Sequence, residues 1–167
     1  MIEKLNNLSK ENQKFELEKC CGSSKWIKSM LDSIPYSDND SLHNNCDIAW
    51  SKCIEEDYLE AFTHHPQIGD IKSLKKKFSN TSHWASNEQK GTSIASDEIL
   101  QELKSGNEAY LKKFGFIFIV CATGKSAQQM LELLNKRLPN NRDKELIIAA
   151  NEQNKITHLR LDKFLED

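Results

Sequence analysis

Helix-breaking residues are scarce in this sequence, since only three prolines and six glycines interrupt its 167 residues. Between these interruptions apolar residues recur every three or four positions, which is the spacing of one face of an α-helix. Strand and helix patterns do not alternate, so a parallel sheet with crossover helices is not favoured. We therefore predict an all-α fold, a compact single-domain helical bundle over residues 1–167 with no substantial β-sheet.

Start and stop signals divide the chain into predicted helices. The expected ranges are 10–21, 24–34, one or two helices within 41–64, 85–91, 97–114, 126–138 and 141–165. Ser24 and Asn141 are expected helix caps, and Ser126 with Gln129 has the spacing of a capping box. The core candidates within 41–64 are Ile48, Ala49, Cys53, Leu59 and Phe62.

The segment Phe114–Ala122 departs from the helical pattern. Its run Phe-Gly-Phe-Ile-Phe-Ile-Val-Cys-Ala has the composition of a strand. The chain offers no obvious partner strand, and a lone strand cannot satisfy its main-chain polar groups. Two interpretations stay open: a buried extended segment or the start of a helix.

Charge and cysteine content narrow the class of protein. The net charge is -2, whereas a nucleic-acid-binding protein usually has a basic excess, so no nucleic-acid partner is expected. We interpret Lys75–Lys77 as a solvated helix face. The five cysteines are odd in number and lack Cys-x-x-Cys spacing, which favours reduced thiols. The chain shows no signal-peptide layout, membrane-length apolar run or peroxisomal tripeptide, so we expect a cytoplasmic protein without a membrane partner.

Taken singly, His65 and Arg160 are the two residues that could act in catalysis or ligand binding. Arg160 falls on an apolar stripe of the last predicted helix, where a guanidinium needs a partner. An internal carboxylate, a route to water or an anionic ligand held by the planar fork would each meet that need. His65 precedes Pro66, which disfavours helix at His65 and places it on a turn. It is either an ordinary surface histidine or a group that exchanges protons near neutral pH.

Other catalytic signatures are weak or missing. No His-x-x-x-His or His-Glu-x-x-His spacing occurs, so no metal site is expected. A Gly-rich phosphate loop and a Gly-x-Ser-x-Gly elbow are also missing, and a Cys–His nucleophile pair has no local signature. Glu88 and Gln89, taken alone, are ordinary residues of a predicted helix.

Three segments together resemble the family of 2-oxo-4-hydroxy-4-carboxy-5-ureidoimidazoline (OHCU) decarboxylases. His65-Pro66-Gln67-Ile68-Gly69-Asp70 resembles the family's His-Pro-x-Ile-Gly signature. The segment 114–122 is similar to its Phe-Gly-Phe-x-Phe segment, and 145–161 is similar to its last helix. The order and separation of the three segments also match, over roughly residues 5–165 of the chain.

The resemblance implies an all-helical enzyme that decarboxylates OHCU to S-allantoin, the last step from urate to allantoin. Because this small-molecule substrate contains its own electron sink, no cofactor is expected. Family members are often homodimers. The catalytic residues implied are His65, Glu88 and Arg160. The substrate-binding residues implied are Pro66, Ala85, Ser86, Glu88, Gln89, Phe118, Ile119, Val120, Cys121, Ala122 and Arg160.

One position departs from the family pattern. Ala85 stands where the family often has serine, and the neighbouring Ser86 is turned by about 100° if this stretch is helical. A hydrogen bond expected from that side chain must come from elsewhere. Two other functions stay open: a non-catalytic helical binding module in which Arg160 pairs internally, and a related enzyme acting on another ureido compound.

Overall fold

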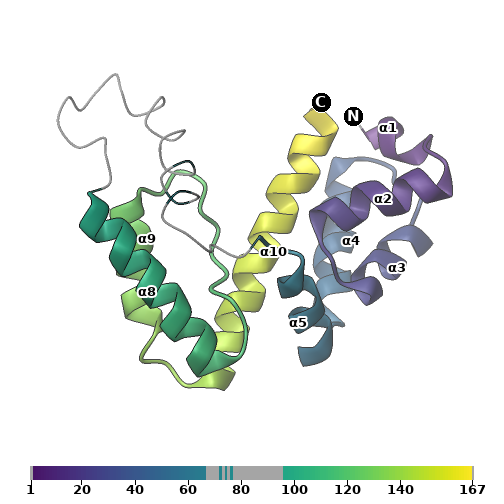
Figure 1. Ribbon diagram of the computed structural model, residues 1–167. Coiled ribbons are helices and arrows are strands. Elements are labelled where there is room, and N and C mark those ends of the chain that lie inside the picture. Colours follow the sequence, from purple (N-terminus) through teal and green to yellow (C-terminus); the bar gives the residue numbers. More distant parts are fainter. Residues whose placement is uncertain (1, 67–71, 73, 75, 77–95, 167) are drawn as a thin grey trace. The chain divides into compact units, whose positions relative to one another are not determined.

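A computed structural model describes residues 2–66, 72, 74, 76 and 96–166 (Figure 1). Several sequence predictions lie outside these residues: the helix over 85–91, the candidates Ala85, Ser86, Glu88 and Gln89, the stretch 67–70 of the His-Pro motif, and Lys75 and Lys77.

Every regular element in the described ranges is a helix, which confirms the predicted all-α class. The helices are α1 (Ile2–Asn6), α2 (Lys10–Cys20), α3 (Ser24–Asp32), α4 (Asn39–Ser51), α5 (Glu55–Thr63), α8 (Asp97–Phe114), α9 (Ala127–Arg137) and α10 (Arg142–Glu166). None of these helices is long and apolar enough to cross a membrane.

The helix boundaries follow local chemistry closely. Ser126 and Gln129 form the predicted capping box of α9, and Asn141 accepts a hydrogen bond from the main-chain N–H of Lys144. The predicted cap of α3 was wrong by one residue. Ser23 accepts from the main-chain N–H of Trp26, whereas Ser24 is already helical and donates its hydroxyl to Glu60.

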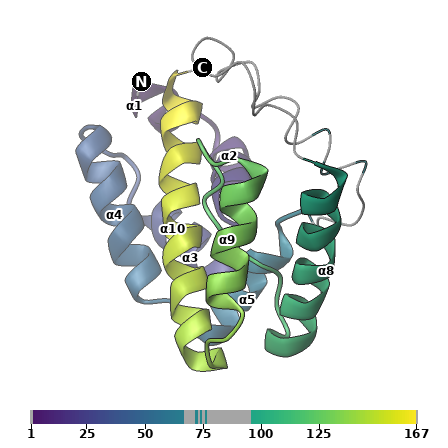
Figure 2. The ribbon, with the colours of Figure 1, turned by 90° about the vertical axis from the view of Figure 1, so that its left-hand side faces the viewer.

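The described chain forms two compact units, and α10 contributes to both. The first unit contains the described residues of 1–65, 119–121 and 146–167, and the second those of 66–118 and 122–145. In the first unit, α3 packs against α2, α4 and α5 (Figure 1). In the second, α8 packs against α9 (Figure 2).

Two tryptophans, Trp26 and Trp50, lie in the core of the first unit. Trp26 is fully buried, and Trp50 donates its indole N–H to the carbonyl of Ala150 at 3.0 Å, which joins α4 to α10. The predicted core residues Ala49, Cys53 and Phe62 are buried and Leu59 is half-buried. The prediction for Ile48 was wrong: it is 50% exposed, because it lies on the outer face of α4.

The segment after α8 is neither helix nor strand, so its interpretation as the start of a helix was wrong. Gly115 ends α8 with φ +79°, a left-handed conformation that suits glycine. In the second unit Phe116 and Phe118 pack on Tyr110, with ring centroids 5.9 and 5.2 Å away. In the first unit the main-chain N–H of Cys121 donates to a carboxylate of α10, so a side chain satisfies a main-chain group that has no partner strand.

Candidate functional site

His65 lies on a turn directly after α5, as its position before Pro66 predicts. Its main-chain N–H donates to the carbonyl of Phe62 at 3.2 Å, which closes the turn. The side chain is half-buried, and its Nε2 is hydrogen-bonded to Oε1 of Gln153 on α10. The turn therefore holds an imidazole against the last helix.

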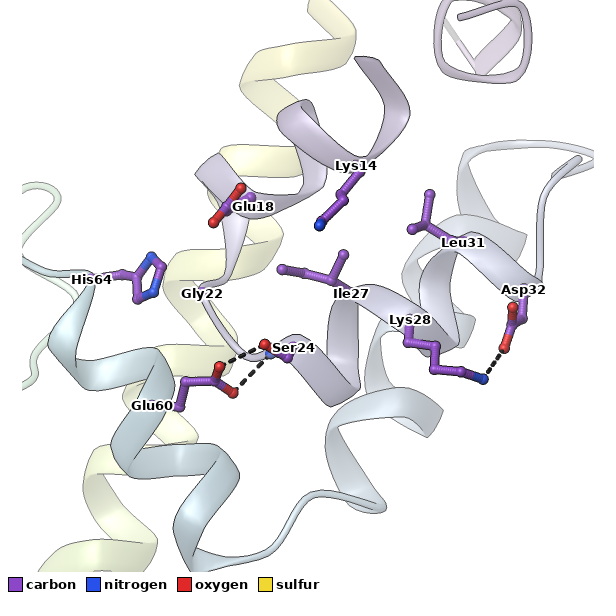
Figure 3. Close-up of a pocket in the computed structure, with 10 residues that line it drawn as sticks. All are labelled: Lys14, Glu18, Gly22, Ser24, Ile27, Lys28, Leu31, Asp32, Glu60 and His64. Carbon is purple, nitrogen blue, oxygen red and sulfur yellow. Dashed lines mark hydrogen bonds and ion pairs between the residues drawn. The ribbon is translucent and has the colours of Figure 1, made fainter. Parts of the chain in front are cut away.

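The neighbouring His64 lines a different part of the first unit from His65. His64, Glu60 and Ile27 line a pocket of about 380 Å³ in the first unit, in which Ser24 donates to Glu60 at 2.6 Å (Figure 3). Its lining also includes lysines, carboxylates and the apolar Leu31. His65 is not part of that lining.

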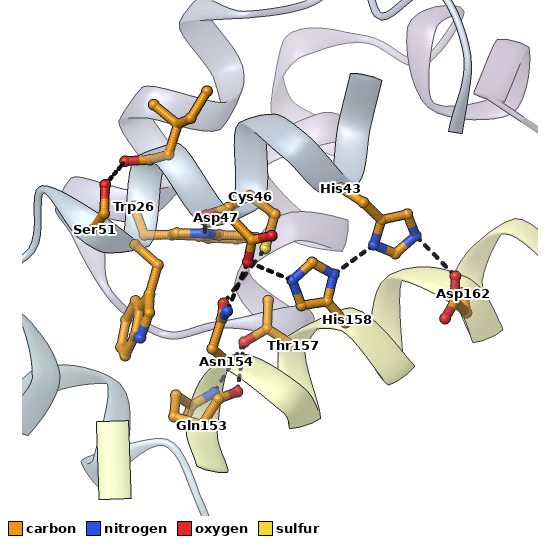
Figure 4. A network of polar contacts seen from close by, with 12 residues as sticks. Trp26, His43, Cys46, Asp47, Ser51, Gln153, Asn154, Thr157, His158 and Asp162 are labelled. Carbon is orange, nitrogen blue, oxygen red and sulfur yellow. Dashed lines mark hydrogen bonds and ion pairs between the residues drawn. The ribbon is translucent and has the colours of Figure 1, made fainter. Parts of the chain in front are cut away.

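Gln153 is the fully buried polar partner of His65. Its side-chain nitrogen donates to Oγ1 of Thr157 at 3.1 Å, one helical turn further along α10 (Figure 4). Thr157 in turn donates to the main-chain carbonyl of Gln153 at 3.0 Å. From the sequence, Gln153 lies on the same stripe of the last predicted helix as Arg160, seven residues earlier, and no role was predicted for it. A glutamine on such a stripe needs hydrogen-bond partners, and that requirement is the signal that could have identified it.

Residues 119–121 are joined to α10 by a hydrogen bond to Glu152, the residue before Gln153. The main-chain N–H of Cys121 donates to Oε2 of Glu152 at 2.8 Å, and Lys155 pairs with Oε1 of the same carboxylate at 2.7 Å. Ile119 is buried, whereas Val120 and Cys121 are half-buried. Part of the segment expected to contact substrate is thus fixed beside the helix that holds His65.

Arg160 is half-buried on α10. Its guanidinium hydrogen-bonds to main-chain carbonyls and does not form an ion pair within the described residues. Its Nη1 donates to the main-chain carbonyls of Lys19 and Cys20 at 3.2 and 3.4 Å. Both carbonyls belong to the last turn of α2, where a cation is favoured by the helix dipole. Within the described residues no carboxylate pairs with Arg160, and its other N–H groups make no hydrogen bond.

Gln153, which contacts His65, lies on the same face of α10 as Arg160. Gln153 and Arg160 are seven residues apart, which is nearly two full turns and about 10 Å along the helix axis. The structure therefore brings His65 to the same helical face as Arg160. Residues 119–121 join that helix through Glu152.

The remaining candidates are less closely placed. Pro66 is exposed and Ala122 is half-buried. Phe118 packs in the second unit with the guanidinium of Arg137 4.6 Å from its ring centroid. The roles of Glu88, Gln89, Ala85 and Ser86 stay predictions from the resemblance, because these residues lie outside the described ranges.

Buried cysteines are poor candidates for a nucleophile. Burial raises the pKa of Cys20 and of Cys21 to about 12, although nearby Arg160 lowers that of Cys20 slightly. Burial also raises the pKa of Cys46 and Cys53. Because the thiolate is the reactive form, these four side chains are unreactive near neutral pH. No group of three or more metal-ligating side chains is found in the described part of the chain.

Comparison with known proteins gives consistent matches. The family model described as OHCU decarboxylase matches residues 6–162. The uric acid degradation bifunctional protein TTL of Arabidopsis thaliana is 41% identical over 154 residues, covering 91% of this chain. The chain spans about half, 47%, of that relative's length.

Two further matches cover most of both chains. An OHCU decarboxylase of Halalkalicoccus jeotgali is 27% identical, covering 97% of this chain and 90% of the relative. A crystal structure of OHCU decarboxylase solved in the presence of (S)-allantoin aligns with a TM-score of 0.72 and 40% identity. That alignment covers 91% of this chain and 98% of the solved one.

Proposed function

The chain belongs to the OHCU decarboxylase family, and from that premise we propose that it is a carboxy-lyase converting OHCU to S-allantoin, the last step of urate degradation to allantoin. The 40% identity to an OHCU decarboxylase over nearly its whole length is the observation that carries this proposal. The imidazole and guanidinium that the chemistry requires lie along one helix of this chain.

The proposed reaction needs no electron sink from the protein. OHCU carries a hydroxyl and a carboxylate on one ring carbon, beside a C=N bond. When the carbon–carboxylate bond breaks, CO₂ leaves and its electron pair forms a C=C bond as the ring nitrogen takes a proton from water. The hydroxyl then loses its proton to become a carbonyl, and the ring carbon bearing the ureido group gains one. The protein must orient the ring, exclude water and move those protons.

His65 and Arg160 are assigned complementary parts in this reaction. His65 exchanges the proton of the hydroxyl or of the new ring carbon, and its position on a turn fixed to α10 supports that role. Arg160 binds an anionic or carbonyl end of the substrate through N–H groups that it does not use on α2. Glu88 and Gln89 bind ring and ureido N–H groups, by analogy with the family.

The deciding experiment supplies freshly made urate-oxidase product and follows the circular dichroism of allantoin. We expect the protein to accelerate the appearance of the S enantiomer over spontaneous decay, and a His65→Asn variant to lose both rate and chirality. If the wild-type protein left rate and chirality at the spontaneous values, the proposal would be wrong. Full rate with pure S-allantoin from the variant would remove His65 from the mechanism.

A non-catalytic binding module is the second candidate, and the bonds of Arg160 to the end of α2 favour it, because they give the guanidinium an internal partner. The same assay separates the two, since a module would bind product or analogue without turnover. A related enzyme would turn over another ureido compound instead.

The proposed enzyme is a cytoplasmic homodimer. Light scattering of the purified protein tests whether it is a dimer.

A further inference from the structure

Gln153 is a neutral polar side chain with no solvent exposure, and both ends of its amide have partners. The two ends are not equivalent, because the oxygen only accepts hydrogen bonds and the nitrogen only donates them. Which end faces His65 therefore decides which protonation form of the imidazole fits the site.

Thr157 sets the direction of that amide. Its hydroxyl proton is directed to the main-chain carbonyl of Gln153 at 3.0 Å, so Oγ1 presents lone pairs to the amide. The amide nitrogen donates to Oγ1 at 3.1 Å (Figure 4). Reversing the amide would either set its oxygen against those lone pairs or make the hydroxyl give up its bond to the main-chain carbonyl, in a position where Thr157 is only 1% exposed and water cannot replace the lost bond.

The acceptor oxygen of Gln153 consequently faces Nε2 of His65, and that nitrogen must carry a proton. A neutral imidazole has one N–H, so its lone pair is then on Nδ1. The geometry points to Gln153 as a positioning residue that holds neutral His65 in the Nε2–H tautomer and makes Nδ1 the nitrogen that exchanges protons with substrate. This inference rests on the proposed function for the identity of that substrate.

The proton balance closes on one imidazole. Nδ1 takes the proton of the substrate hydroxyl, which leaves an imidazolium with an N–H at each nitrogen. Transfer of the Nδ1 proton to the ring carbon restores the starting tautomer, while Nε2 donates to Gln153 throughout. An amide suits this cycle because it orients the ring without adding a negative charge that would favour the imidazolium.

Nuclear magnetic resonance of the ¹⁵N-histidine-labelled full chain tests the tautomer without substrate. His65 is assigned by comparison with His65→Asn. We expect a protonated Nε2 and an unprotonated Nδ1 in the neutral wild-type protein, and mixed tautomers in Gln153→Leu. A wild-type His65 protonated at Nδ1 would overturn the inference, as would an unchanged tautomer in Gln153→Leu.

The threonine provides a conservative pair of variants that keeps Gln153 in place. Thr157→Val removes the hydroxyl at nearly constant volume, so the amide loses its directing partner and His65 should again show mixed tautomers. Thr157→Ser retains the hydroxyl and should restore the wild-type signal. Identical tautomers in the Val and Ser variants would show that Thr157 does not set the amide.

Kinetics with OHCU give a readout that simple destabilisation does not move. Gln153→Leu should lower kcat by on the order of 10-fold or more, because part of the population has the wrong tautomer. Gln153→Glu should shift the acidic limb of the pH–rate profile upward by about one unit or more, because a carboxylate favours the imidazolium. An unshifted profile in Gln153→Glu would contradict the contact with His65.

Asn154→Ala is the matched control on the same helix. Asn154 donates to Asp47 of α4 at 2.7 Å and does not touch His65, so the variant should lose stability but keep the tautomer and the pH profile. A changed tautomer in this control would assign the effect to general loosening of α10. If wild-type protein fails to turn over OHCU, the proposed function falls while the tautomer measurement still decides the role of Gln153.

Discussion

At the scale of single residues, Arg160 combines a structural role with the proposed binding role. Replacing it with lysine keeps the positive charge near the end of α2 but removes the planar fork. We therefore expect Arg160→Lys to retain most of the stability and to lose OHCU turnover sharply. Thermal melting and the chiral allantoin assay measure the two effects on the same sample. Unchanged kinetics would reject the binding role, whereas equal losses of folding and activity would make the structural role dominant.

A second residue-scale prediction concerns the buried ion pair of the second unit. Arg137 donates from Nε to Glu145 at 2.5 Å, and Tyr110 and Asn140 also donate to that carboxylate. Glu145→Leu leaves the buried guanidinium without its carboxylate and should cost about 3–5 kcal/mol of unfolding free energy. Urea denaturation measures this cost.

The double variant Arg137→Met/Glu145→Leu removes both charges and should recover most of that loss, because desolvation of the pair offsets much of its attraction. If the double variant were as unstable as the single one, the loss of unfolding free energy would come from altered packing and not from the unpaired charge. Lys28→Ala serves as the control, since its pair with Asp32 is exposed and should contribute about 0–1 kcal/mol.

Residue-scale sequence reasoning identified His65 and Arg160 but left their partners open. The position of His65 on a turn followed from Pro66, because the effect of proline on its neighbour is local. The contact with Gln153 joins residues 88 positions apart, and the contacts with the α2 carbonyls join residues 140 and 141 positions apart. Such contacts depend on how helices pack, and no local pattern in one sequence reports them.

At the scale of elements, α4 and α10 are joined by a chain of polar groups. Asp162 contacts Nε2 of His43 at 2.8 Å, the two Nδ1 atoms of His43 and His158 lie 2.6 Å apart, and His158 contacts Asp47 at 2.8 Å (Figure 4). The central bond requires one proton between two facing ring nitrogens. Asn154 also donates to Asp47, so this carboxylate receives two hydrogen bonds.

The stability that Asp47 supplies should depend on pH. Partial burial raises its pKa, but hydrogen bonds from Asn154 and His158 outweigh burial and hold the pKa below its usual value. A group with a lowered folded-state pKa stabilises above its unfolded pKa of about 4, and this contribution disappears as the pH falls through the folded value. Urea denaturation of wild type and Asp47→Asn should therefore differ at pH 7, and the difference should narrow as the pH falls below about 4.

The control for this experiment is Asp32→Asn, whose carboxylate is exposed on another helix. It should change stability little at either pH. A difference between Asp47→Asn and wild type that persists unchanged at pH 3 would show that the side chain acts through packing rather than through its charge.

Element boundaries were the most predictable part of the fold. The range of α8 and the caps of α9 and α10 were predicted correctly, because capping and helix-stopping residues act within one turn. The short α1 was not predicted, since its five residues contain too little periodicity. The conformation of 115–122 was left undecided because its partner, Glu152, lies about 30 positions away in sequence.

At the scale of the whole molecule, sequence alone did not reveal the division into two compact units. Both units are assembled from separate stretches, and three residues, 119–121, join the first unit in the middle of the second. A division of that kind has no linker or composition change to mark it. The predicted single domain over 1–167 stays a prediction, which chemical unfolding followed by probes in each unit would test.

The distribution of thiols over the molecule gives a prediction for chemical labelling. Cys20, Cys21, Cys46 and Cys53 are buried, whereas Cys121 is half-buried. With a pKa of about 12, only on the order of one thiol in ten thousand is ionised at pH 8 for Cys20 and Cys21. Iodoacetamide at pH 8 should therefore modify Cys121 first, as read by peptide mass spectrometry. Equal labelling of Cys20 and Cys121 in the folded protein would contradict the burial.

The attachment of Cys121 to α10 through its main-chain N–H also bears on how the protein ages. Peroxide attacks accessible sulfur first, so oxidative damage should begin within the segment 118–122, which the family resemblance assigns to substrate binding. A sulfenic acid formed there is chemically reversible, whereas higher oxides are not. Loss of function in stored or stressed samples should then be recovered by dithiothreitol at an early stage and become permanent later.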